Sequence, residues 1–354
     1  MGAKPEGNIP EARKGHTMSK ARTREAIEGY LFLLPNLLGF LIFFAFPLLI
    51  SFYYSFTDYN LFTDPNFVGL DNYAKALGFS FDTGAYQNVL TQGGNWFAAM
   101  SALLVPNDPN FWVALGNTFL YALGVLALSI APAFLLAWML NSKLVGMTVF
   151  RALIYIPVVA SIVGCALIWA WIYQQPSGVI DTVITFVVTG LNNLIFNAMG
   201  TPLVDPNVAW LTSPDTALIS LIIMTSWSTV GYDMVVFLSA LQGIPNHLYE
   251  AATVDGSSRW NTLFSIVIPM MTPTIFFLLV TNSIAALQIF SEPYILTQGG
   301  PANSTLTIVY YLYQKGFQRF QMGYGASLAW IVFGLIFLVT FAQFRFSSRW
   351  VFEE

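Results

Sequence analysis

A polar segment between residues 249 and 269 has the residue types of a docking element rather than those of a catalytic centre. Helix-forming residues come first, a glycine and two serines interrupt them, and the chain then resumes to Pro269. This order predicts a knob of two short helices joined at a glycine bend. Its small side chains allow another protein's surface to approach the backbone closely. The residues expected to make that contact are Glu250, Ala251, Ala252, Asp255 and Gly256.

Two strongly apolar segments, 216–242 and 271–292, carry several polar and aromatic side chains. Polar groups inside apolar spans are costly, and they mark a transport pathway or a helix contact. Amide, hydroxyl and aromatic side chains together bind ligands that present both hydroxyl groups and apolar CH faces. We therefore expect a substrate pathway that includes Trp227, Ser228, Tyr232, Asn282 and Gln288. The alternative is that such polar groups only form hydrogen bonds between helices.

Asp233 is a carboxylate that the sequence places deep within an apolar segment. A proton relay is one role for such a group, but we expect no second ionisable residue within a span to accompany it. We therefore favour a buried hydrogen-bonding role for Asp233.

The sequence carries no signature of an enzyme, a cofactor site or a metal site. None of its lysines follows a glycine, so the G-K-[ST] end of a phosphate-binding loop is absent, and G-x-S-x-G and H-E-x-x-H are absent as well. The two histidines, His16 and His247, lie far apart, and the single cysteine, Cys165, rules out a disulfide within the chain. A net charge of -4 offers no basic field for nucleic acid.

The composition predicts a membrane protein. Of 354 residues, 56% are hydrophobic and only 9% are charged, whereas a soluble domain has about 25% charged residues. A helix needs about 20 apolar residues to cross a bilayer. The predicted fold is all-α, with six transmembrane helices. The segments that qualify are 31–56, 111–140, 149–173, 216–242, 271–292 and 324–346.

Lysine and arginine residues set the expected orientation, because cytoplasmic loops carry an excess of both. Eleven of the 14 lie in the N-terminal tail, in the 141–151 turn, in the 243–270 loop or at the C-terminal end. The exceptions are Lys75, Lys315 and Arg319. Both termini are therefore expected in the cytoplasm, and loop 174–215, which has no Lys or Arg, is expected outside.

The predicted organisation has four parts. Residues 1–28 form a polar cytoplasmic tail, 29–110 the first span with an extended outer segment, 111–346 a core of five spans with the 243–270 loop, and 347–354 a second tail. The tail does not read as a cleavable signal peptide, and Met18 is a second plausible start. We expect an interfacial helix around 96–104, and a surface-lying helix at 178–200 in place of a seventh span.

The polar knob resembles the EAA motif, E-A-A-x3-G-x9-I-x-L-P, of permeases of binding-protein-dependent ABC importers. The matching residues are Glu250, Ala251, Ala252, Gly256, Ile266 and Pro269, and Ile268 stands where the family usually has leucine. Residues 67–73 (FVGLDNY), 209–211 (AWL) and 297–301 (TQGGP) are similar to the carbohydrate-importing branch, which includes the larger maltose permease subunit. The likeness covers about residues 29–346.

This resemblance implies the fold and the partners of a type I ABC importer permease in the inner (cytoplasmic) membrane. In that family the EAA loop is a coupling helix that docks into a cleft of an ATP-binding subunit. ATP and Mg then belong to two ATPase subunits, a second related permease completes the pathway, and an extracytoplasmic sugar-binding protein delivers the substrate. The family's sugar contacts, aligned on Glu250, fall near Ser228, Thr229, Tyr232, Asn282, Ala285 and Ala286.

Two alternatives are left open by the sequence. The first is an importer of the same family for a glycerol-phosphate compound or another polyol. A phosphate group would favour Arg or Lys in the pathway, and segments 216–242 and 271–292 have neither. The second is a secondary transporter, which would need internal repeats and a coupling-ion site.

Overall fold

The chain is described by a computed structural model that covers residues 20–93, 95–96, 103–141, 146–176, 178–187 and 208–352. Its internal contacts divide the chain into two compact units, with the boundary between Tyr53 and Tyr54. In the first unit, helix α1 (Lys20–Phe40) continues through a π-helical turn, η1 (Leu41–Ala45), into α2 (Phe46–Tyr54). Residues 27–54 form one apolar stretch of 28 residues, long enough to cross a bilayer.

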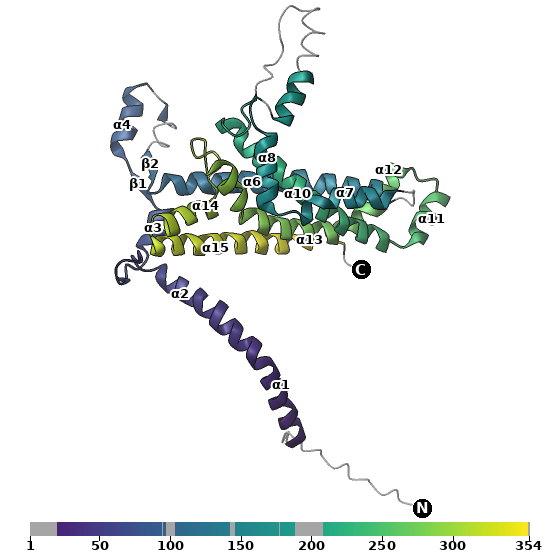
Figure 1. Ribbon diagram of the computed structural model, residues 1–354, viewed down its shortest axis with the longest axis horizontal. Coiled ribbons are helices and arrows are strands. Elements are labelled where there is room, and N and C mark those ends of the chain that lie inside the picture. The colour runs from purple at the N-terminus through teal and green to yellow at the C-terminus, as the bar shows by residue number, and fades with distance from the viewer. Residues whose placement is uncertain are drawn as a thin grey trace, which may run out of the picture. The chain divides into compact units, whose positions relative to one another are not determined.

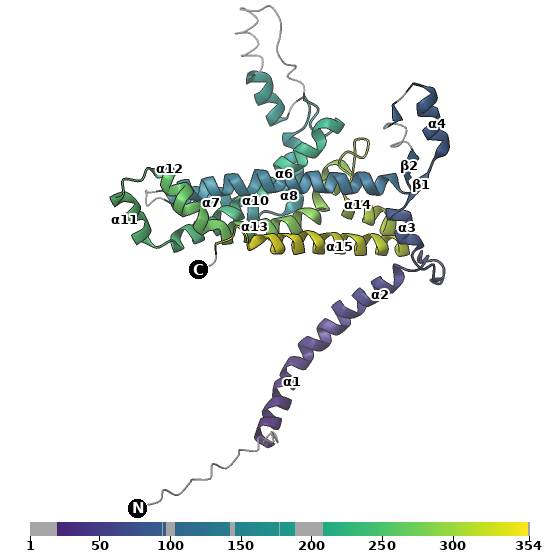
Figure 2. The same ribbon diagram turned by 180° about the vertical axis from the view of Figure 1, so that it is seen from behind.

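Four long helices of the second unit run side by side (Figures 1 and 2). Half of the apolar window of α10 is buried within the protein, against 28% or less for the other three, so α10 is the central helix. Its largest helix contact is with α6. The four helices are α6 (Pro109–Leu140), α10 (Pro214–Gly243), α13 (Ile268–Leu287) and α15 (Met322–Ser347).

The third predicted span, 149–173, is not one straight helix. It consists of α7 (Met147–Val159) and α8 (Ile162–Ile172), whose axes differ by 100°. Pro157 lacks a backbone N–H and weakens the last turn of α7. Ala160 and Ser161 then adopt extended backbone angles, and α8 runs across the direction of the four-helix bundle (Figure 1).

The prediction of six spans agrees with this architecture once the bent pair is counted as one span. Within the described residues, five further helical stretches are long and apolar enough to cross a membrane. The fifth span starts earlier than predicted, because α12 (Arg259–Thr262), the π-helical turn η2 (Leu263–Val267) and α13 form one continuous stretch. These stretches are Ile27–Tyr54, Pro109–Leu140, Pro214–Gly243, Arg259–Leu287 and Met322–Ser347.

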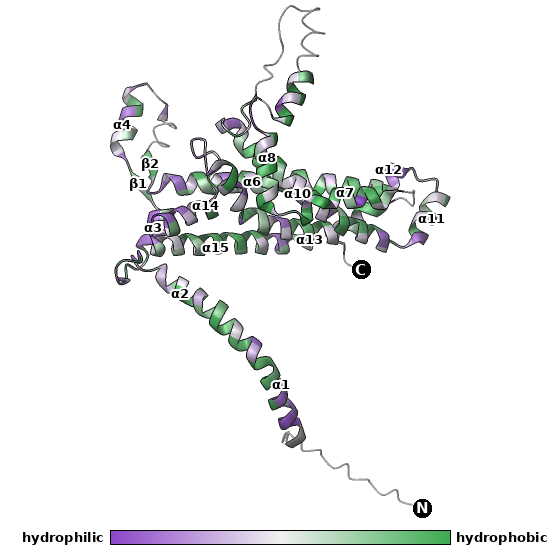
Figure 3. Ribbon diagram, viewed as in Figure 1, coloured by the Kyte–Doolittle hydropathy of each residue, from purple (hydrophilic) through white to green (hydrophobic). Residues whose placement is uncertain are grey.

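The two ends of the bundle carry short and more polar elements (Figure 3). One end holds α11 (Asn246–Val254) and α12, and the other holds α3 (Asp71–Leu77) and α14 (Ile308–Tyr313), followed by η4 (Gln314–Gln318). The hydrophobic spans lie between these ends, as expected of helices with lipid around their middle.

The outer segment contains two short strands that the all-helical prediction missed. Strand β1 (Phe79–Phe81) pairs antiparallel with β2 (Leu104–Pro106), and α4 (Thr83–Thr91) follows β1. The helix expected at 96–104 is therefore wrong at Leu104, and its residues 97–102 lie outside the described residues. The surface helix expected at 178–200 is helical over 179–187, and its remainder also lies outside them.

A close crossing fixes α7 against α10. A Cβ atom at Gly231 of α10 would stand 2.4 Å from the backbone oxygen of Ile154 in α7, so only glycine allows the two backbones to meet there. Nearer the α11 end of the bundle, Phe237, Met271 and Leu278 are fully or almost fully buried in one apolar cluster. In lipid such packing, rather than transfer from water, holds helices together.

Candidate functional site

The predicted knob of two short helices is present at the junction of α10 and α13. Helix α11 ends at Val254, and Gly256, two residues further on, has φ +70°. The N–H of Gly256 donates to the oxygen of Thr253 at 3.1 Å, and the N–H of Ser257 donates to the oxygen of Ala252 at 2.9 Å. This pair of bonds is the Schellman motif, which needs a left-handed residue at the position of Gly256. The glycine bend expected from the sequence is thus confirmed.

The second helix of the knob starts directly after that turn. Ser258 caps it, since its hydroxyl oxygen accepts a hydrogen bond from the N–H of Asn261 at 3.2 Å. Because α12 continues through η2 into α13, the knob has no flexible connection to this span. Its other side joins α10 through the two residues Ile244 and Pro245. A displacement of the knob must therefore reach both α10 and α13.

The first helix of the knob and its glycine turn present an accessible surface that includes two carboxylates, Glu250 and Asp255. Glu250, Ala251, Asp255 and Gly256 are exposed, and Ala252 is buried. Within the described chain Glu250 takes part in no ion pair. A Cβ atom at Gly256 would have no neighbour within 4 Å in this chain. Packing within this chain therefore does not require a small residue at position 256. The open space there could receive the surface of a partner protein.

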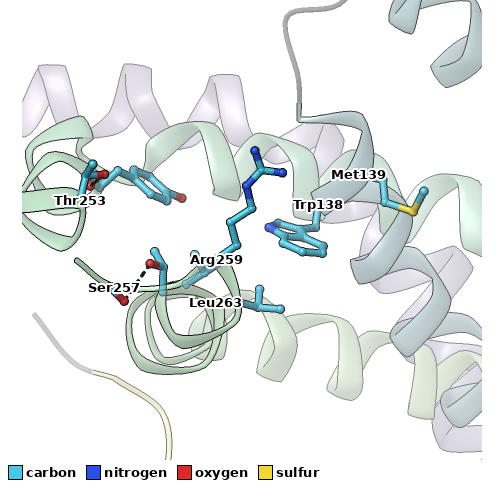
Figure 4. Close-up of a pocket in the computed structure, with 9 residues that line it drawn as sticks. Trp138, Met139, Thr253, Ser257, Arg259 and Leu263 are labelled. Carbon is cyan, nitrogen blue, oxygen red and sulfur yellow. Dashed lines mark hydrogen bonds between the residues drawn. The ribbon is translucent and has the colours of Figure 1, made fainter. Parts of the chain in front are cut away.

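A pocket of about 470 Å³ lies between the knob and the end of α6. Figure 4 shows the Arg259 side chain reaching into it, between Trp138 of α6 and Thr253 of α11. Ser257 and Thr262 close one wall, where their hydroxyl oxygens lie 3.2 Å apart. The guanidinium of Arg259 places a positive charge between the knob and α6. The sequence predicts that this end of the bundle faces the cytoplasm.

A second cavity of about 310 Å³, the polar cavity, lies between the long helices, and its polar groups are set in a mainly apolar wall. It brings together side chains from α6, α10 and α13 with Ile162, the first residue of α8 after the bend in the third span. Hydroxyl, amide and carboxylate groups line it together with apolar residues. Its polar residues are Tyr121, Thr225, Thr229, Asn282, Gln288, Ser291 and Glu292.

The cavity gathers some of the residues predicted for the pathway and not others. Thr229, Asn282, Ala286 and Gln288 line it, as does Ala285. Trp227, Ser228 and Tyr232 are absent from its wall. Trp227 instead packs edge-on against Trp169 of α8, with ring centroids 5.6 Å apart, and the Ser228 hydroxyl donates to the Met224 oxygen at 3.2 Å.

Asn282 is also committed to a helix contact. Its Nδ2 donates to Oδ2 of Asp233 at 2.8 Å, and both residues are buried. The hydrogen-bonding role expected for Asp233 agrees with this geometry. Asn282 retains its amide oxygen as an acceptor for a ligand.

Sequence reasoning missed Glu292, a second buried carboxylate. It is only 4% exposed, and it lies in the cavity wall next to Thr225. In the structure Glu292 lies five residues beyond the end of the span Arg259–Leu287, so it is a buried carboxylate next to the spans rather than a second ionisable residue within one. Glu292 is the last residue of predicted segment 271–292, and an acidic residue in that apolar setting was the available signal.

A polar cluster joins the elements at the opposite end of the bundle from the knob. Asp108 caps α6, and its Oδ2 accepts hydrogen bonds from the hydroxyls of Tyr311 at 2.5 Å and Tyr324 at 2.6 Å. Lys75 lies over the Tyr324 ring at 4.7 Å, and Lys315 over the Tyr311 ring at 5.1 Å. Two of the three basic residues that departed from the charge bias thus share one site, stabilised by ring faces.

The six spans and the knob between α10 and α13 agree with the expected ABC-importer permease fold, and comparison with known proteins gives the family. Residues 17–352 match the model of the binding-protein-dependent transport system inner membrane component, so the chain belongs to that family of multi-pass membrane proteins. The family is a transport component of ABC importers, as the knob at Glu250–Gly256 indicates.

Two relatives and one solved structure show how far the likeness extends. The probable ABC transporter permease protein YesP of Bacillus subtilis is 32% identical over 98% of both chains. The lactose transport system permease protein LacF of Rhizobium radiobacter is 35% identical over 67% of this chain and 76% of its own. A bacterial alginate ABC transporter, solved with a periplasmic protein that holds an alginate pentasaccharide, has a chain with the same fold. Its TM-score is 0.64 at 21% identity, with 94% of this chain and 97% of that chain covered.

Proposed function

We propose that the chain is the translocation subunit of an ATP-driven importer for a sugar or oligosaccharide. One observation carries the proposal: a cavity whose mainly apolar wall includes hydroxyl and amide groups lies along α10 and α13, the two helices that the EAA knob connects. A relative named for lactose transport supports the substrate class. The cavity wall has no Lys, Arg or His among the described residues, which argues against a phosphorylated polyol.

We infer the partners from the knob and from the family. The exposed face of Glu250, Ala251, Asp255 and Gly256 suits a cleft on an ATP-binding subunit, and ATP with Mg would be held there and not in this chain. Two such subunits would serve this chain and a second, related permease. The family's dependence on a binding protein supports an extracytoplasmic sugar-binding protein as the donor of substrate.

We propose the orientation that the bias of Lys and Arg residues and the docking knob support. In it the knob, the pocket around Arg259 and both termini are cytoplasmic, and the Asp108 cluster is outside. Transport would then proceed by alternating access. When the ATPase subunits close, they shift the knob. Because α12 continues into α13, and only Ile244 and Pro245 separate α10 from α11, the walls of the cavity move with it.

The proposal is tested by uptake into proteoliposomes that contain this chain, its partner permease and the ATPase subunits, with binding protein outside and ATP inside. Neutral disaccharides and trisaccharides, lactose included, are the substrates offered. We expect accumulation that stops when ATP is replaced by a non-hydrolysable analogue. Uptake that instead followed a proton or sodium gradient without ATP would identify a secondary transporter and overturn the proposal.

A further inference from the structure

We propose that Glu292 makes the pathway selective for uncharged sugars. Its carboxylate accepts hydrogen bonds from sugar hydroxyl groups in the polar cavity, and it repels substrates that carry a carboxylate, sulfate or phosphate group. This inference rests on the proposed sugar-import function and adds the charge class of the substrate.

The position of Glu292 is unusual for a carboxylate. It lies five residues after the end of α13, at the start of the π-helical turn η3 (Pro293–Thr297), and it is 4% exposed. A buried carboxylate is costly unless hydrogen bonds or a cation compensate it. A surface role or a solvated loop position is therefore excluded for this side chain.

A directed pair of hydroxyl groups points at this carboxylate. The Tyr121 hydroxyl donates to Oγ1 of Thr225 at 2.7 Å, and Thr225 Oγ1 is 3.4 Å from Oε1 of Glu292. The second distance is longer than the usual range of about 2.5–3.0 Å for an O–H···O bond. Among the described residues, Thr225 provides the side-chain hydrogen bond to Glu292. An ionised carboxylate can accept about four hydrogen bonds. Glu292 therefore retains acceptor capacity towards the cavity.

Nothing positive balances Glu292 in the cavity wall. Among the described residues that line it there is no Lys, Arg or His. An anionic substrate would bring a second negative charge into a poorly hydrated space, where like charges repel more strongly than in water. A neutral sugar instead brings hydroxyl donors, and two on adjacent ring carbons match the two oxygens of a carboxylate.

The amide groups nearby complete a site for a neutral polyhydroxylated ligand. Gln288 and Asn282 line the same cavity, with the amide oxygen of Asn282 left over from its bond to Asp233. The fold alone does not decide between charge classes, because a neighbour with this fold imports the acidic polysaccharide alginate. In this chain the carboxylate of Glu292 selects the uncharged class of substrate.

The test uses the assembled complex in nanodiscs without binding protein, so that only the membrane pathway selects. The probes are a pool of neutral di- to tetrasaccharides and the same pool oxidised at C6 to uronates, and bound sugars are read by mass spectrometry. For the wild type we expect at least tenfold preference for the neutral members. In Glu292→Gln we expect neutral binding to fall about three- to tenfold and the preference to shrink to about twofold or less.

Two further variants keep the result decisive. Asp215→Asn removes one exposed carboxylate from the first turn of α10, outside the cavity, and should leave the preference unchanged. Glu292→Asp keeps the charge and should keep the preference, which also serves if Glu292→Gln fails to assemble. An undiminished preference in Glu292→Gln, or a lost preference in Glu292→Asp, would overturn the inference. Absence of ATP-dependent uptake by the wild type would instead count against the proposed function.

Discussion

Asn282 of α13 donates its amide N–H to the carboxylate of Asp233 of α10 at 2.8 Å, and this bond joins the two helices that leave the knob. Both residues were candidates for direct roles in transport. The bond gives them first a mechanical role, because it holds α10 and α13 together beside the polar cavity. Breaking it would also leave a carboxylate buried without that donor.

Substitutions at Asp233 separate a hydrogen-bonding role from a proton-carrying one. We expect Asp233→Leu to lower the free energy of unfolding by about 1–3 kcal/mol, because it leaves the Asn282 amide buried without its acceptor. Asp233→Asn keeps an acceptor oxygen and should retain most of the stability and of the uptake. Thermal unfolding of the purified complex and uptake rates measure both. If Asp233→Asn were as damaging as Asp233→Leu, the charge itself would be required.

Gly256 offers a test of coupling through the knob. Its φ of +70° costs a residue with a side chain about 1–2 kcal/mol, but asparagine tolerates this region better than leucine does. We expect Gly256→Leu to abolish stimulation of ATP hydrolysis by the sugar-loaded binding protein while the subunit still inserts.

The matched variant Gly256→Asn distinguishes the backbone from the docking surface. A Cβ atom here meets nothing in this chain, so any remaining loss in Gly256→Asn reports on contact with the ATPase subunit. Partial stimulation is the expected result. Full stimulation in the leucine variant would show that coupling does not pass through this loop.

The orientation is tested by cysteine labelling at the two ends of the bundle. The native Cys165 is buried, so it should not react with the label, and single cysteines can be introduced at other positions. We expect Arg259→Cys to react with an impermeant maleimide only from the cytoplasm, and Asn303→Cys only from outside. Reaction of position 303 from the cytoplasm alone would contradict the proposed topology.

Asp108 should make stability depend on pH in acid. Burial raises the pKa of Asp108, but hydrogen bonds from Tyr311 and Tyr324 and the charge of Lys315 outweigh it, so its pKa lies below the usual value. A lowered folded pKa gives stability that is present above about pH 4 and is lost as the pH falls through the folded value. We expect Asp108→Asn, which keeps a capping oxygen, to be about 1–3 kcal/mol less stable at pH 7.

The measurement is thermal unfolding of both proteins between pH 7 and pH 3. The stability difference should be constant above about pH 5 and should shrink below about pH 4. Tyr311→Phe removes one donor, and it should move the loss to higher pH. A difference that stayed constant down to pH 3 would rule out titration of Asp108 as its source.

Much of the fold was predictable because the hydropathy of a segment and the residues that end its helices act locally. The long spans follow from apolar length, and the turn at Gly256 follows from a glycine after helix-forming residues. The bend between α7 and α8 was not predictable in the same way, since Pro157 lies in an apolar stretch where neighbouring helices often tolerate proline. The strand pair β1–β2 joins residues 79–81 with 104–106, and periodicity within one short segment does not reveal such a partner.

The site was harder to predict because a cavity is a property of several helices together. Trp227 and Tyr232 have the residue types of a sugar site, yet neither lines the cavity. Trp227 lies on another face of α10 from Thr225 and Thr229, and Tyr232 lies about one turn beyond Thr229 towards the knob. Glu292 is the last residue of predicted segment 271–292. It lies in the cavity wall because Thr225 of α10 and Tyr121 of α6 pack next to it. Residue type was therefore a weaker guide than position on the helix face.

At Gly231 the backbones of α10 and α7 cross with no room for a side chain between them. Measured along α10, the knob end at Gly243 lies about 18 Å from the crossing on one side, and Thr225 in the cavity wall about 9 Å on the other. A rigid α10 that turns about this point moves its two ends in opposite directions, with the cavity end travelling about half as far. A displacement of the knob would therefore become a smaller movement in the opposite direction at the cavity, which would narrow the cavity on one side and widen it on the other.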